Sequence, residues 1–114
     1  LGLPYAPARA LIEGGVRVAL GTDFNPGSCM SECLPLMTTL ACTQMKMSPA
    51  EALLAVTREA ALALGRGDRL GRLAPGMQAD LLILDIPNYL HLPYHFGLNH
   101  VASVIKEGAT VFER

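Results

Sequence analysis

A single carboxylate stands where a largely apolar run of the chain meets a small polar turn. Asp23 comes shortly after the run at residues 16–20, and Phe-Asn-Pro-Gly-Ser follows it. In parallel α/β folds, chemistry gathers where the carboxyl ends of strands meet the following loops. An acid at such a strand end is more readily catalytic than one on a helix surface, so we expect Asp23 to be a catalytic acid.

The turn after Asp23 carries groups that can bind a small molecule. Asn25 has two amide donors and a carbonyl acceptor, Ser28 has a hydroxyl, and Gly27 lets the backbone approach a ligand without a clashing side chain. Neighbouring backbone amides there can form a nest for a carboxylate. A structural reading stays open beside this one, because Asn-Pro-Gly-Ser is common turn chemistry and Asp23 could cap the following helix.

The spacing of the cysteines does not predict a metal site. Cys29 and Cys33 lie four residues apart without a partner histidine, which is a weak metal signal. We therefore interpret them as small buried hydrophobic residues on a helix. Together with Cys42 they make an odd number with no secreted-scaffold pattern, which favours a reducing cytoplasm.

The histidines and the remaining strand-flanking acids are assigned to structure. His91, His95 and His100 are loosely spaced near the carboxyl end, whereas a zinc site needs three or four ligands converging from rigid elements. Asp80 and Asp85 flank an apolar run, and acids in such places are usually solvated or part of turns.

Helices must flank the strand that delivers Asp23. Residues 6–13, which are followed by Gly14-Gly15, predict a helix with a glycine stop, and residues 16–20 predict a strand covered on both faces. Apolar residues at helical spacing predict a second helix over 32–45. Ser48-Pro-Ala-Glu51 has the pattern of a capping box and predicts a third helix that runs to Leu64.

The pattern changes near residue 66. Residues 81–84 form a compact apolar run that predicts a buried strand, and residues 101–105 and 110–112, separated by Glu-Gly, predict a closing hairpin. We therefore expect an α/β chain with a barrel-type half and a β-rich half.

Composition argues for an enzyme interior and against two classes of partner. The chain is 51% hydrophobic and 17% charged, with a formal net charge of -1. It has no clustered Lys and Arg for nucleic acid and no apolar run of the ~18 residues needed to cross a bilayer. Strand-end acids of this kind belong to folds of ~250 residues, so we expect these 114 residues to be part of a longer protein.

Five motifs together resemble the carboxyl-terminal part of the imidazolonepropionase family, in the amidohydrolase superfamily. They are LGTDFNPGS at 20–28, LACT at 40–43, MSPAEAL at 47–53, GMQADL at 76–81 and LPYHFG at 92–97. The GMQADL type of motif is shared by many amidohydrolases, whereas DFNPGS and LPYHFG are much closer to this one family. The resemblance covers nearly the whole chain.

The resemblance implies a metal-dependent hydrolase that opens the ring of 4-imidazolone-5-propanoate to give N-formimidoyl-L-glutamate in histidine degradation. Its fold would be a distorted (β/α)8 TIM-type barrel joined to a small β-sandwich, with residues 1–66 as the last barrel strand and helices and residues 67–114 as sandwich strands. Asp23 matches a ligand of a zinc or iron ion and is the candidate to orient and deprotonate a metal-bound water. Asn25, Gly27 and Ser28 match positions that contact substrate or product. The resemblance also places Tyr94, His95 and Phe96 in the small domain or at its junction with the barrel, where they are expected to pack or hydrogen-bond.

The chain departs from the family in having no His-x-His, so the other metal ligands would lie outside it. Alone, it should bind metal weakly and catalyse nothing. Two alternatives stay open: another amidohydrolase, such as a cyclic-amide hydrolase or a base deaminase, and a non-catalytic association module. For the longer protein we also consider a homodimer.

Overall fold

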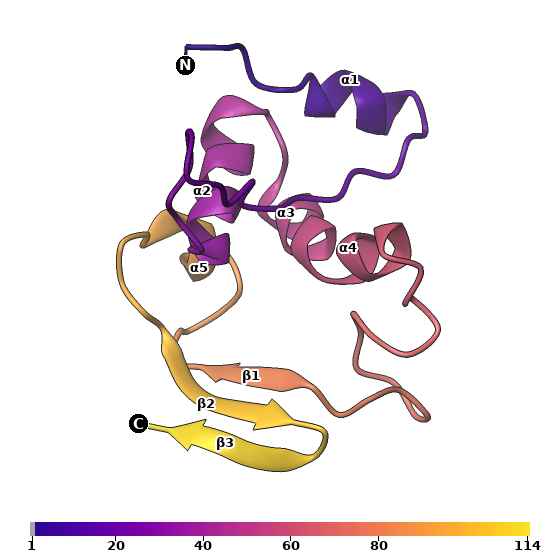
Figure 1. The fold of residues 1–114 in the computed structure, drawn as a ribbon, viewed down its shortest axis with the longest axis vertical. Coiled ribbons are helices and arrows are strands. Elements are labelled where there is room, and N and C mark those ends of the chain that lie inside the picture. The colour runs from indigo at the N-terminus through magenta and orange to yellow at the C-terminus, as the bar shows by residue number, and fades with distance from the viewer. Residues whose placement is uncertain (1) are drawn as a thin grey trace.

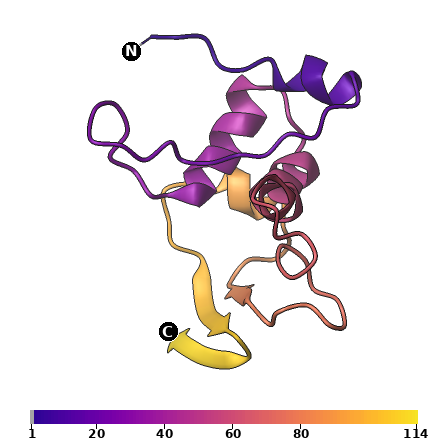
Figure 2. The same cartoon turned by 45° about the vertical axis from the view of Figure 1, so that its right-hand side comes forward.

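The computed structural model describes residues 2–114 as a group of short helices and a small antiparallel sheet. Two views agree that the helices gather toward one end of the molecule and the sheet lies at the other (Figure 1 and Figure 2). The α/β class is therefore as predicted. None of the helices in this part of the chain combines the length and apolar character required to cross a bilayer.

The first two helices confirm the sequence prediction closely. Helix α1 (Ala8–Glu13) lies within the expected range 6–13, and Gly15, with a φ of 81°, turns the chain after it. Helix α2 (Leu34–Gln44) lies within 32–45 and has proline in its first turn, where no amide hydrogen is needed.

Helix α3 (Pro49–Val56) begins with the predicted capping box. The Ser48 hydroxyl accepts a hydrogen bond from the Glu51 amide at 3.2 Å, and Glu51 Oε2 accepts one from the Ser48 amide at 2.8 Å. Arg9 of α1 donates to Glu51 Oε1 at 2.6 Å. The Arg9 bond, with the Ser48 amide, lowers the pKa of Glu51 to about 2.

The helix predicted to continue to Leu64 breaks instead at Thr57. Its φ and ψ are -119° and -91°, and a separate helix, α4 (Arg58–Ala63), follows. Threonine is β-branched, and the Thr57 hydroxyl bonds the Leu53 carbonyl oxygen at 2.7 Å, both of which disfavour a continuous helix. Gly71 lies against this bend, where a Cβ would come within 2.8 Å of the Thr57 carbonyl oxygen.

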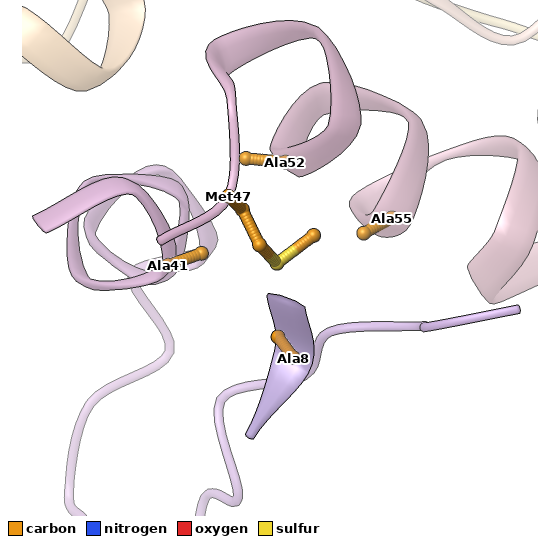
Figure 3. Close-up of a cluster of buried hydrophobic side chains, with 5 residues drawn as sticks. All are labelled: Ala8, Ala41, Met47, Ala52 and Ala55. Carbon is orange, nitrogen blue, oxygen red and sulfur yellow. The ribbon is translucent and has the colours of Figure 1, made fainter. Parts of the chain in front are cut away.

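The helical core is small and built mainly from alanine. Met47 reaches from the loop before α3 into a space bounded by four alanines of α1, α2 and α3 (Figure 3). Alanine lets the helices approach closely, and the unbranched methionine side chain fills the irregular gap between them. The cluster consists of Ala8, Ala41, Met47, Ala52 and Ala55.

Residues 16–20 form no strand, so this prediction is wrong for the chain as described. The segment crosses the helices as irregular chain (Figure 2). Val18 and Leu20 pack against the alanine core, and the Leu20 amide donates to the Ala55 carbonyl oxygen at 3.0 Å. A strand exists only through ladder bonds to a neighbour, and no strand within residues 2–114 pairs with this segment.

The predicted hairpin is confirmed, within a sheet whose strand order is β1-β2-β3. Strand β1 (Leu81–Leu84) pairs antiparallel with β2 (Val101–Lys106), which pairs antiparallel with β3 (Ala109–Glu113). Glu107 and Gly108 join the last two strands with φ values of 52° and 82°. Two positive φ values in a two-residue loop suit the right-handed twist of a hairpin.

The expectation that residues 81–84 are buried is wrong for the described residues. Leu82 is 56% exposed and Ile83 is 50% exposed, because the faces of this three-stranded sheet are not covered by a second complete layer. One helix was not predicted: α5 (His91–Tyr94), which is held to α2 by a 3.1 Å hydrogen bond from the buried Thr39 hydroxyl to the Pro93 carbonyl oxygen.

Candidate functional site

Asp23 ends the irregular segment that crosses the helices. Its φ is 52°, in the left-handed region that few residues besides glycine adopt, although aspartate tolerates it better than most. The residue is exposed, and its carboxylate has no hydrogen-bond or ion-pair partner among residues 2–114. Its oxygens are therefore open to a ligand from outside the described chain.

The residues that follow Asp23 close into a compact loop. The Asn25 amide donates to the Cys29 carbonyl oxygen at 2.8 Å, and the Cys29 amide donates back to the Asn25 carbonyl oxygen at 3.2 Å. Figure 2 shows this loop projecting beside the start of α2. The paired backbone of Asn25 and Cys29 brings together the three predicted ligand-contacting residues, Asn25, Gly27 and Ser28.

The side chain of Asn25 organises the loop from inside. Its Oδ1 accepts hydrogen bonds from the Gly27 and Ser28 amides, both at 2.9 Å. Its Nδ2 donates to the Asp23 carbonyl oxygen at 2.6 Å and to the Ser28 hydroxyl at 3.2 Å. The backbone nest expected to take a carboxylate is thus satisfied by Asn25 Oδ1 within the loop. The predicted contacts of Asn25, Gly27 and Ser28 with a ligand stay predictions.

The cysteines do not behave as the buried helical residues that were expected. Cys33 is exposed, while Cys29 and Cys42 are half-buried. Cys29 lies in the loop, and its thiol donates to the Thr22 carbonyl oxygen at 3.1 Å, a bond that sequence spacing gave no way to foresee. Partial burial raises the pKa of Cys42 in α2, with a further contribution from Glu51.

The histidines come together although their spacing is loose. The ring centroids of His91, His95 and His100 lie 5.3–6.1 Å apart, and His100 Nε2 bonds the His95 carbonyl oxygen at 2.7 Å. The packing and hydrogen bonding expected of Tyr94, His95 and Phe96 are found in part: His95 takes part in the bond above, and the Tyr94 ring lies edge-on to His91 with a centroid distance of 6.0 Å. Tyr94 is nevertheless 80% exposed and Phe96 is 60% exposed.

Asp80 has the structural environment assigned to it from the sequence. Its carboxylate accepts hydrogen bonds from the Glu107 amide and from Gln78 Nε2, both at 2.8 Å, and forms an ion pair with Lys106. These donors, Lys106 first, lower the pKa of Asp80. The side chain thereby ties the start of β1 to the hairpin, at the opposite end of the molecule from α1.

The donor set near Asp23 fits one ligand of a metal ion and no more. A carboxylate oxygen is an ordinary ligand of zinc, but a complete site needs three or four such groups. Across residues 2–114, no group of three His, Cys, Asp or Glu side chains is arranged to hold a metal ion. Any further ligands must therefore come from outside the described residues.

Comparison with known proteins places these features in a family. The family model described as "Amidohydrolase family" matches residues 2–112. The chain is 53% identical over 108 residues to the imidazolonepropionase of Rubrobacter xylanophilus and 50% identical over 108 residues to that of Parabacteroides distasonis. Each match covers 95% of this chain and 26% of the relative, so the chain spans about a quarter of the length of these relatives.

A solved structure shares the arrangement of the elements. The structure of an adenosine deaminase from Xanthomonas campestris with bound zinc superimposes with a TM-score of 0.83 at 28% sequence identity. The match covers 96% of this chain and 28% of that protein. The helices and the small sheet therefore take the same relative places as in a zinc-containing deaminase.

Proposed function

Because the chain belongs to the amidohydrolase family, we propose that it is the carboxyl-terminal part of a metal-dependent hydrolase that opens 4-imidazolone-5-propanoate to N-formimidoyl-L-glutamate. The observation that carries this proposal is the identity of about half of the residues, over nearly the whole chain, with curated imidazolonepropionases. We place this enzyme of histidine degradation in the cytoplasm, in keeping with three free cysteines.

We propose that residues 1–66 complete a TIM-type barrel and residues 67–114 contribute strands to a small β-sandwich. The unpaired segment 16–20 supports the first part, because it packs on helices on one side and lacks only strand neighbours. The exposed apolar residues Leu82 and Phe112 support the second, because a second layer would cover them.

Asp23 is proposed as one ligand of a zinc or iron ion, with the other ligands outside this chain. A metal of this kind, when bound, supplies a water whose pKa is lowered from ~16 toward ~7. The Asp23 carboxylate is suited to accept the proton of the attacking water, since no other group in the described chain occupies its oxygens. The same carboxylate can then return that proton to the ring nitrogen that leaves the acyl carbon.

The loop after Asp23 is proposed to form the substrate side of the site, through Asn25, Gly27 and Ser28. The exposed Gly27 carries no side chain, so a ligand can approach the backbone there. The Ser28 hydroxyl is also exposed and can donate or accept a hydrogen bond.

The proposal is tested with the whole protein and the substrate named above. Formation of N-formimidoyl-L-glutamate, together with zinc or iron retained after gel filtration, is the expected result. Release of ammonia from a purine or pyrimidine base instead would favour a deaminase, the function that the structural match to the adenosine deaminase supports. Turnover of neither substrate class would overturn both and leave a hydrolase of another cyclic amide or a non-catalytic association module.

A further inference from the structure

The backbone at Asp23 is held in an uncommon conformation by two side chains of the following loop. Asp23 has a φ of 52°, and a non-glycine residue in this region persists only where its surroundings enforce it. Asn25 Nδ2 donates to the Asp23 carbonyl oxygen at 2.6 Å, and the Cys29 thiol donates to the Thr22 carbonyl oxygen at 3.1 Å. The backbone carbonyls of Thr22 and Asp23, which precede the loop, are therefore both held by side chains of the loop.

The amide of Asn25 has no capacity left over once these bonds are counted. One Nδ2 hydrogen serves the Asp23 carbonyl and the other serves the Ser28 hydroxyl. The Oδ1 atom accepts from the Gly27 and Ser28 amides, which uses the two lone pairs of a carbonyl oxygen. A direct bond from this amide to a ligand would have to replace one of these contacts.

The Asp23 side chain, by contrast, has no hydrogen bond of its own within the described chain, and its backbone sets the direction of the Cα–Cβ bond. Since its carboxylate has no partner among residues 2–114, the direction in which it leaves the chain follows from the backbone that Asn25 holds. We propose that Asn25 is a positioning residue: its amide donor fixes the Asp23 backbone and so aims the carboxylate at the metal. This inference rests on the proposed function and gives Asn25 a role beyond the substrate contact proposed above.

The test separates positioning from substrate contact in the whole protein. Asn25→Asp keeps an oxygen acceptor for the Gly27 and Ser28 amides but removes the donor to the Asp23 carbonyl. Loss of a group that orients a metal ligand typically costs about 10–100-fold in metal affinity or activity. We expect Asn25→Asp to lose zinc or iron on dialysis against a chelator and to lower kcat by that factor, with KM changed less than threefold. Asn25→Ala, which removes every amide bond, should do the same if the aspartate variant does not fold.

Asn99→Asp is the matched control, because Asn99 Oδ1 accepts from the Val101 amide at 3.0 Å in a similar local turn near the sheet. It should retain metal, kcat and KM. A raised KM with unchanged metal retention in the Asn25 variants would overturn the positioning role in favour of substrate contact, and wild-type behaviour in all respects would overturn it outright. Failure of the proposed function is distinct, because then the wild-type protein itself would neither hold metal nor open the ring.

Discussion

The loop around Asp23 and the junction around Asp80 use the same side chain in opposite ways. The Asp80 carboxylate accepts hydrogen bonds from the Glu107 amide and from Gln78 and forms an ion pair with Lys106. These contacts join the start of β1 to the hairpin. Asp23 receives no donor on its carboxylate from residues 2–114, while its backbone is held by Asn25. Of the two acids, only Asp23 therefore has a carboxylate that the described residues leave free to bind a ligand.

Replacing Asp23 should have the largest effect on turnover. Asp23→Asn keeps the shape and removes the proton acceptor and the charge, so turnover of the whole protein should fall by about 10²–10⁴-fold, the usual contribution of a general base. Asp80→Asn should leave turnover within a small factor of wild type. Steady-state kinetics on 4-imidazolone-5-propanoate measure both, and similar losses in the two variants would remove the distinction between the two acids.

A side chain at Gly27 should disturb the loop less severely. A Cβ there would lie 3.2 Å from Asn25 Oδ1, and the branched side chain of valine would force the Asn25 amide away from its partners. Leaving such partners unpaired costs ~1–3 kcal/mol, or about 5- to 150-fold in kcat/KM. Gly27→Ala, with a single added carbon, is the control and should lose less kcat/KM than Gly27→Val. Equal kcat/KM for wild type and both variants would show that the loop takes no part in substrate binding or catalysis.

Glu51 is a third carboxylate, and it caps the start of helix α3. Glu51→Gln should weaken the capping box and the bond to Arg9, and loss of a cap typically costs ~0.5–2 kcal/mol. The folded-state pKa of about 2 lies below the usual 4.5, so the stabilisation is complete above about pH 4.5 and is lost as the pH falls toward 2. Urea unfolding of both proteins at several pH values checks this, and a difference that grew on acidification would contradict it.

Asp80→Asn should have the smallest effect, and only on stability. Lys106 and the Glu107 amide depress the pKa of Asp80 in the folded protein. The ionised Asp80 therefore adds to the free energy of unfolding above its unfolded pKa of ~3.9, and this stabilisation is lost as the pH falls through the lower folded pKa. Because the Lys106 side chain is 55% exposed and the Asp80 side chain 27% exposed, water and salt reach the pair, and salt should weaken it further. The unfolding midpoint at neutral pH, with and without 1 M salt, measures this; a salt-independent difference would assign the effect to packing.

Elements whose partners are close in the chain were predictable from the sequence. The capping box of Ser48 and Glu51 and the two-residue turn at Glu107 and Gly108 depend on residues only a few positions apart, and both are present. Residues 16–20 show the limit, because their apolar pattern predicts a strand, whereas no strand within residues 2–114 pairs with them. The bend at Thr57 was missed for a related reason: helix periodicity continues through it, and the contact with Gly71 comes from a later segment.

The candidate site was predictable in position but not in bonding. The turn residues predicted the loop that follows Asp23, which is present, and the role of Asp23 itself stays a prediction. The Asn25 side-chain amide forms hydrogen bonds with Asp23, Gly27 and Ser28. These bonds depend on the backbone conformation of the loop, which residue types alone do not specify. The grouping of the three histidines was likewise not predictable, because it depends on α5 and on the turn that leads to His100.

Metal retention in three versions of the whole protein tests the central claim most directly. Wild type, Asp23→Asn and Asp80→Asn are dialysed against the same chelator, and zinc and iron per chain are then measured. Wild type and Asp80→Asn should keep their metal and Asp23→Asn should lose most of it, since Asp23 alone of the two acids has oxygens free of protein donors within residues 2–114. Equal retention by Asp23→Asn and wild type would contradict the assignment of Asp23 as a metal ligand.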